Sequence, residues 1–191
     1  MKPFRPLSAF ALALFAGTAL AHPGHEAASF MSGFAHPIGG LDHLLAMLAV
    51  GLYAARQASG PRWLLPATFV VAMLAGAGLS ALGVVLPAVE FGIASSVLVL
   101  GLLIAFIVKL PTAAALSLVA VFAACHGHAH HAEMGDGSVL GFTIGFAIAT
   151  ALLHAVGYAL ARWMPETRPA LIARRVAGAA IAGAGALFLA S

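Results

Sequence analysis

The residues of this chain best suited to chemistry are its histidines, of which there are nine against six acidic residues. A first group lies in the sequence HPIGGLDH at residues 36–43. His36 and His43 are seven residues apart, so they share a face if the helix is continuous. Asp42 points about 100° away from His43 on a regular helix. It is therefore either a direct metal ligand, if the Gly-Gly pair distorts the helix, or an acceptor for an imidazole N–H. The alternative to a metal site is a capped helix start with a histidine bonded to a neighbouring helix.

A second group lies in the sequence HGHAHHAE at residues 126–133. If a helix continues through it, His126, His130 and Glu133 fall at i, i+4 and i+7 on one face. Two imidazoles and a carboxylate suit nickel, cobalt, zinc or copper(II), whereas oxygen-only sites suit magnesium or calcium. Such tracts also occur as loose metal-attracting loops or pH-sensitive solvated segments. We predict an ordered metal site with these three ligands, in preference to His128 and His131.

Two single residues are further candidates for metal binding. Glu90 follows Pro87 at the outer end of an expected helix, level with the two histidine groups. A carboxylate in a first turn also simply complements the helix dipole. His154 lies about 22 Å from the outer end of its expected helix, at about 1.5 Å per residue. It is either a relay site for the ion or a histidine bonded to a backbone carbonyl.

The elements that carry these residues are expected to be membrane-spanning helices. The chain is 62% hydrophobic and only 8% charged, whereas a soluble domain has about 25% charged residues. A spanning helix needs about 20 apolar residues, and six stretches come near that length. They are residues 33–55, 63–82, 88–108, 112–129, 139–161 and 175–190. The sequence thus predicts an all-α integral membrane protein, with residues 22–191 as one six-helix membrane domain. Charged groups inside such spans cost about 2.5–3.5 kcal/mol each, which makes them functional candidates.

The distribution of basic residues predicts the orientation of the chain. Residues 1–21 have the pattern of a secretory signal peptide, with Lys2 and Arg5 before an apolar stretch and Ala-Leu-Ala at its end. The alternative is an uncleaved anchor helix. If residue 22 lies outside, the first, third and fifth connections are cytoplasmic. Those connections and their flanks hold every basic residue of the mature chain: Arg56, Arg62, Lys109, Arg162, Arg168, Arg174 and Arg175. The positive-inside rule then predicts a bacterial inner-membrane protein with both mature termini in the periplasm.

Three motifs resemble the HupE/UreJ family. The pattern His-Pro-x-x-Gly-x-Asp-His-x-x-Ala-Met matches residues 36–47, a histidine-rich stretch ending in glutamate matches residues 125–133, and Ala-Thr-Ala-Leu-Leu-His matches residues 149–154. The resemblance covers essentially the whole chain. It implies a secondary nickel or cobalt permease linked to hydrogenase or urease maturation proteins. It points to His36, Asp42, His43, His130 and Glu133, and supports Glu90 and His154. This chain has His131 where the family pattern leads us to expect glycine.

The function expected from these residues is inward transport of Ni²⁺ or Co²⁺ through an intramembrane His/Asp/Glu site, without a permanent cofactor. The chain has no P-loop glycine-lysine motif, so the ion gradient must drive transport. The lipid bilayer is the expected partner, and the scattered charge of +3 does not favour nucleic acid. One alternative is a metal-binding sensor or accessory protein for metalloenzyme maturation. The other is an intramembrane hydrolase, pairing Ser80, Ser95 or Ser96 with His154, or a redox enzyme.

Overall fold

The computed structural model describes residues 28–57, 60–134 and 136–191, so the predicted signal peptide lies outside the described residues. The described part is helical, apart from an isolated β-bridge between Ala28 and Gly137. Its helices are α2 (Phe30–Gly39), α3 (Leu41–Ala54), α4 (Leu64–Ala81), α5 (Val89–Ala105), α6 (Thr112–Glu133), α7 (Val139–Trp163) and α8 (Arg168–Ala190).

The lengths of these helices support a multi-pass membrane protein. Helices α4, α6, α7 and α8 are each long and apolar enough to cross a membrane, and α2 with α3 makes a fifth candidate if the bent pair is one span. Helix α5 is apolar but has only 17 residues, about 25 Å at 1.5 Å per residue. Two predicted boundaries differ most from the structure. Helix α6 runs on to Glu133, and α8 begins at Arg168 because Pro169 sits in its first turn, where a missing N–H is no loss.

The first predicted span is two helices rather than one. Helices α2 and α3 meet at an angle of 83°, and Gly40 between them has an extended backbone with φ −91° and ψ 118°. Two successive glycines are poor helix formers, and Asp42 in the first turn of α3 favours a new helix start there. A Cβ on Gly40 would lie 3.0 Å from the Asp42 carboxylate and 3.1 Å from the His43 ring. Glycine therefore leaves room for these two side chains.

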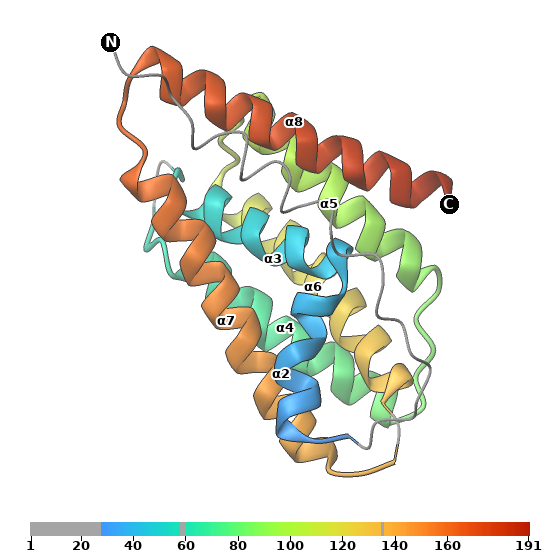
Figure 1. Ribbon diagram of the computed structural model, residues 1–191. Helices are drawn as coiled ribbons and strands as arrows, with labels where there is room; N and C mark the ends of the chain where they lie inside the picture. The colour runs from blue at the N-terminus through green and yellow to red at the C-terminus, as the bar shows by residue number, and fades with distance from the viewer. Residues whose placement is uncertain (1–27, 58–59, 135) are drawn as a thin grey trace.

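Close contacts between helices depend on small residues. The main packing pairs are α4 with α6, α5 with α8, and both α2 and α3 with α7; Figure 1 shows α8 lying along α5. A Cβ on Gly51 of α3 would come within 2.1 Å of the His154 carbonyl oxygen, and one on Gly157 of α7 within 2.2 Å of the Leu48 carbonyl oxygen. Backbones that approach so closely explain the glycine content, as in other membrane bundles. They also fix the depth of His154 relative to α3.

Candidate metal site

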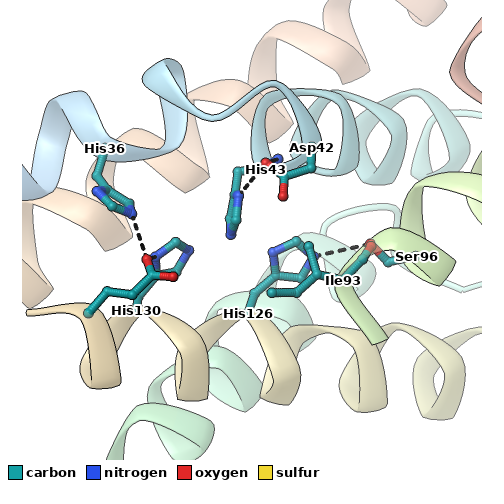
Figure 2. A network of polar contacts seen from close by, with 8 residues as sticks. His36, Asp42, His43, Ile93, Ser96, His126 and His130 are labelled. Atoms are coloured by element: carbon teal, nitrogen blue, oxygen red, sulfur yellow. Dashed lines mark hydrogen bonds and ion pairs between the residues drawn. The ribbon is translucent and has the colours of Figure 1, made fainter. Parts of the chain in front are cut away.

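Three helices carry the predicted histidines to one place beside the start of α3. Figure 2 shows the rings of His36 and His43, from α2 and α3, directed toward the rings of His126 and His130 on α6. The ring centroid of His43 lies 4.8 Å from that of His126 and 4.3 Å from that of His130. The centroids of His36 and His130 are 4.6 Å apart. The bend at Gly40 therefore brings His36 and His43 to one site, although they do not share the face of one helix.

His43, His126 and His130 form what we call the inner group. Their ligand nitrogens all lie within 4.8 Å of one another. His126 is fully buried, His130 is 3% exposed, and the side chain of His43 is 11% exposed. Ligands of a tetrahedral metal at 2.0–2.1 Å are on the order of 3.4 Å apart, so modest ring rotations would close this group around an ion.

Each member of the inner group also has at least one ring nitrogen without a hydrogen-bond partner in the described part of the chain. Among the described residues, no hydrogen-bond partner is found for Nε2 of His43, Nδ1 of His126, or either ring nitrogen of His130. A buried polar atom without a partner is unfavourable by roughly 1–3 kcal/mol. Several such atoms converging on one point indicate a ligand-binding site rather than histidines satisfied by the fold.

Asp42 fixes the ring of His43. Its Oδ1 lies 2.7 Å from Nδ1 of His43 and also accepts the His43 backbone N–H at 2.8 Å. Because a carboxylate only accepts, Nδ1 must donate, and the neutral ring then presents the lone pair of Nε2 to the inner group. Neither cluster of candidate ligands includes Asp42. Of the two roles considered for Asp42, the geometry favours the acceptor that orients a ligand.

Ser96 on α5 fixes the ring of His126 in a similar way, and the sequence did not reveal this role. The Ser96 hydroxyl donates to the carbonyl of Ile93 at 2.6 Å, so its oxygen is left to accept from Nε2 of His126 at 3.1 Å. The lone pair of Nδ1 then faces the inner group. Ser96 is fully buried, but Ser95 precedes it in an apolar helix, and nothing in the sequence distinguishes the two.

Replacing Ser96 with alanine is therefore expected to weaken metal binding about tenfold, at the lower end of the effect of losing a ligand-orienting partner. Isothermal titration of the purified protein with Ni²⁺ measures this change. Ser95→Ala is the matched control, because it removes a hydroxyl from the same turn of α5 without touching His126. Equal affinities of the two variants would show that Ser96 does not orient a ligand.

His36, His130 and Glu133 form a second cluster, which we call the outer group. Their ligand atoms also lie within 4.8 Å of one another. Oε2 of Glu133 is 3.6 Å from Nε2 of His36 and 4.0 Å from Nδ1 of His130. The side chains of His36 and Glu133 are 36% and 56% exposed, so this group opens outward while the inner group is enclosed. His130 belongs to both groups.

His154 lies deeper along α7, separate from both groups. It is 1% exposed, and neither ring nitrogen has a hydrogen-bond partner within the described chain. The Phe69 ring stands between, its centroid 5.5 Å from that of His126 and 5.0 Å from that of His154. The backbone-bonded alternative for His154 therefore finds no support in this geometry.

The remaining candidates lie apart from the two groups. Glu90 is exposed in the first turn of α5 and is in neither group, so the outer-end site expected from the sequence assembles without it. His128 contacts the Val84 carbonyl oxygen at 2.8 Å, and His131 the Ser80 hydroxyl at 3.1 Å. These two histidines thus attach α6 to α4 and to the connection after it.

Comparison with known proteins places the chain in a family. A model of the HupE / UreJ protein family matches residues 10–188, almost the whole chain. The chain belongs to the HupE/UreJ family. It is 42% identical to Protein HupE of Rhizobium leguminosarum bv. viciae over 170 residues, which are 88% of each chain. No solved structure matches.

Membership in the HupE/UreJ family confirms the resemblance drawn from the three motifs and the expectation that the chain is not an enzyme. HupE/UreJ proteins are transporters or accessory proteins. The geometry agrees, because Ser96, one candidate for the hydrolase pair, contacts His126 and not His154. Imidazole-rich sites with one carboxylate suit late divalent transition metals, and the two groups provide such ligands at the surface and in the interior of the bundle.

Proposed function

We propose that this HupE/UreJ protein carries a divalent transition metal, Ni²⁺ or Co²⁺, from the periplasm to the cytoplasm. The observation that carries the proposal is that two metal-sized ligand groups share His130, one group partly exposed and the other enclosed. A storage or sensing site needs only one group. Two groups with a common ligand form a path.

The path runs inward in three steps. The outer group takes the ion from water, since the Glu133 carboxylate and the His36 ring replace part of its hydration shell. The ion then passes to the inner group while His130 stays bound, so it is never without a protein ligand. His154, beyond the Phe69 ring, receives it next on the way to the cytoplasm.

The topology that suits this path has six spans in the inner membrane. The bent pair of α2 and α3 forms one broken span and α5 a short one. Broken helices occur at membrane depth where they line a site rather than face lipid. With both mature termini in the periplasm, the outer group faces the periplasm and the basic connections face the cytoplasm. The delivered metal would serve nickel enzymes such as hydrogenase or urease during maturation.

The membrane potential suffices to drive this transport. Moving one charge across 100 mV is worth about 2.3 kcal/mol, so a divalent cation gains about 4.6 kcal/mol on moving inward. At about 1.4 kcal/mol per tenfold, that supports more than a thousandfold accumulation. No nucleotide is required.

Proteoliposomes test the proposal. Vesicles holding the protein are expected to accumulate radioactive nickel above the external concentration only when a potassium diffusion gradient makes the interior negative, because the potential pulls the cation inward. Unlabelled Co²⁺ is expected to compete and Mg²⁺ is not, since imidazole ligands favour the former.

Protein-free vesicles are the control for leakage of the ion. If the folded protein binds Ni²⁺ in titration but vesicles with and without it accumulate metal equally, the accessory role replaces transport. Accumulation of the same amount of nickel with and without a membrane potential would indicate instead that transport is coupled to another ion.

A further inference from the structure

A second polar site lies at the opposite end of the bundle from the histidines. Helix α3 runs from the inner group at its start to a cavity of about 230 Å³ just past its end. Charged residues of the first, third and fifth connections and their flanks meet around this cavity. They are Arg56, Arg62, Lys109, Arg162, Arg174 and Glu166.

The charges around this cavity do not balance. Five cationic side chains line it against one carboxylate. The side chain of Glu166 is 88% exposed and lies 3.4 Å from Arg56, so its charge is largely screened by water. Burial, followed by the positive charge of Arg174, lowers the pKa of Arg56 below its ordinary value, and only Glu166 opposes this. The cavity is thus a region of uncompensated positive charge.

Several hydrogen-bond donors around the cavity also have no acceptor among the described residues. Arg56 donates through one terminal nitrogen to the carbonyl oxygens of Ala161 and Met164 at the end of α7. Its Nε, Nε2 of Gln57 and Nε of Arg174 are buried and find no acceptor among the residues the structure describes. Three unpaired donors beside excess cations call for a ligand with several anionic oxygens, as a phosphate group has.

An apolar cavity adjoins the cationic one. It shares Arg56, Lys109 and Arg174 with it and is also lined by Leu52 and Leu103; its volume of about 30 Å³ has room only for the beginning of an apolar chain. A free phosphate ion would use only the cationic part. A ligand that is anionic at one end and apolar at the other would use both.

We propose that this cavity binds the phosphate of an anionic phospholipid from the cytoplasmic leaflet, with part of the lipid's apolar portion in the adjoining cavity. Such leaflets carry anionic lipids, and basic residues at this level attract them. On the proposed function this is the end of the bundle where the metal ion leaves for the cytoplasm, and the bound phosphate would offset part of the positive charge that repels it.

Native mass spectrometry of the full-length protein in detergent tests this proposal without any metal. Phosphatidylglycerol is expected to remain bound as one molecule per chain, whereas phosphatidylcholine with the same acyl chains is not. The double variant Arg62→Gln/Lys109→Gln removes two exposed cations of the cavity. It is expected to bind phosphatidylglycerol about 25-fold more weakly, since each basic residue contributes roughly fivefold.

Arg168→Gln is the control. It removes one positive charge from the same end of the bundle, but Arg168 is exposed in the first turn of α8 and does not line the cavity. Unchanged affinity in the control with the loss in the double variant supports the proposal. Equal retention by the folded double variant and the wild type overturns it. Displacement of the lipid by millimolar inorganic phosphate would assign the cavity to a free anion and overturn the lipid assignment.

Discussion

Replacing His130 with alanine is expected to lower the rate of nickel uptake at least about a hundredfold. Loss of a residue that only orients a ligand weakens metal sites about 10- to 100-fold. His130 itself belongs to both the outer and the inner group, so its loss breaks each group and the transfer between them. Initial uptake rates into proteoliposomes at fixed membrane potential measure the effect.

Two further variants separate this role from folding. His131→Ala removes the neighbouring ring, which contacts the Ser80 hydroxyl rather than either group, and is expected to retain most of the uptake. His130→Gln nearly preserves the volume of this buried side chain, so it should fold and still fail to transport. If folded His130 variants carry nickel at the wild-type rate, the ion does not pass through the two groups.

The helices could be predicted well from the sequence because hydrophobic stretches separated by Gly, Pro and polar residues mark membrane helices strongly. The bend of 83° at Gly40 was not predicted, because residues 33–55 were expected to form one span. Two glycines lower helix propensity, but whether the helix kinks or continues depends on packing against α7. The end of α6 was also placed too early, at residue 129. The last turn of α6 is polar. Contacts of His128 and His131 with α4 and the connection after it hold this end of the helix in place.

The ligand groups could be predicted only as far as spacing within one helix allows. The interval from His126 to His130 and Glu133 follows from helix periodicity, and the structure has all three on α6. That Ser96 orients His126 depends on how α5 packs beside α6, which no local pattern encodes. Glu90 was grouped with the histidines because it lies at the same end of its helix. Side chains at one end of a helix bundle can face different directions. Glu90 is exposed and belongs to neither group, so its metal-linked role stays a prediction.

The two groups also explain why Asp42 is expected to affect metal binding without touching the ion. His43 reaches the inner group from a helix start that Gly40 has just interrupted, and its ring is free to rotate unless something holds it. The 2.7 Å hydrogen bond from Nδ1 of His43 to Oδ1 of Asp42 fixes the ring and selects its tautomer. A ring in the wrong tautomer would present an N–H, which cannot ligate a metal.

Replacing Asp42 with alanine is accordingly expected to weaken Ni²⁺ binding by close to a hundredfold, the upper end of the effect of losing an orienting partner. The carboxylate is charged, and charged hydrogen bonds are roughly twice as strong as neutral ones. Asp42→Asn keeps a carbonyl oxygen that can accept from Nδ1 of His43, so it should lose only about tenfold. Titration of the two purified variants with Ni²⁺ measures both effects.

The asparagine variant distinguishes an orienting residue from a ligand. If Asp42 bound the metal directly, an amide oxygen would be a poor substitute for the carboxylate, and Asn would be as damaging as Ala. The visible absorption of bound Co²⁺ gives a second criterion, because it reports the atoms around the ion. At saturating Co²⁺, the spectrum of Asp42→Ala should match that of the wild type, since His43, His126 and His130 still ligate. A changed spectrum together with equal losses in both variants would make Asp42 a ligand, and the geometry of the inner group would then have to include it.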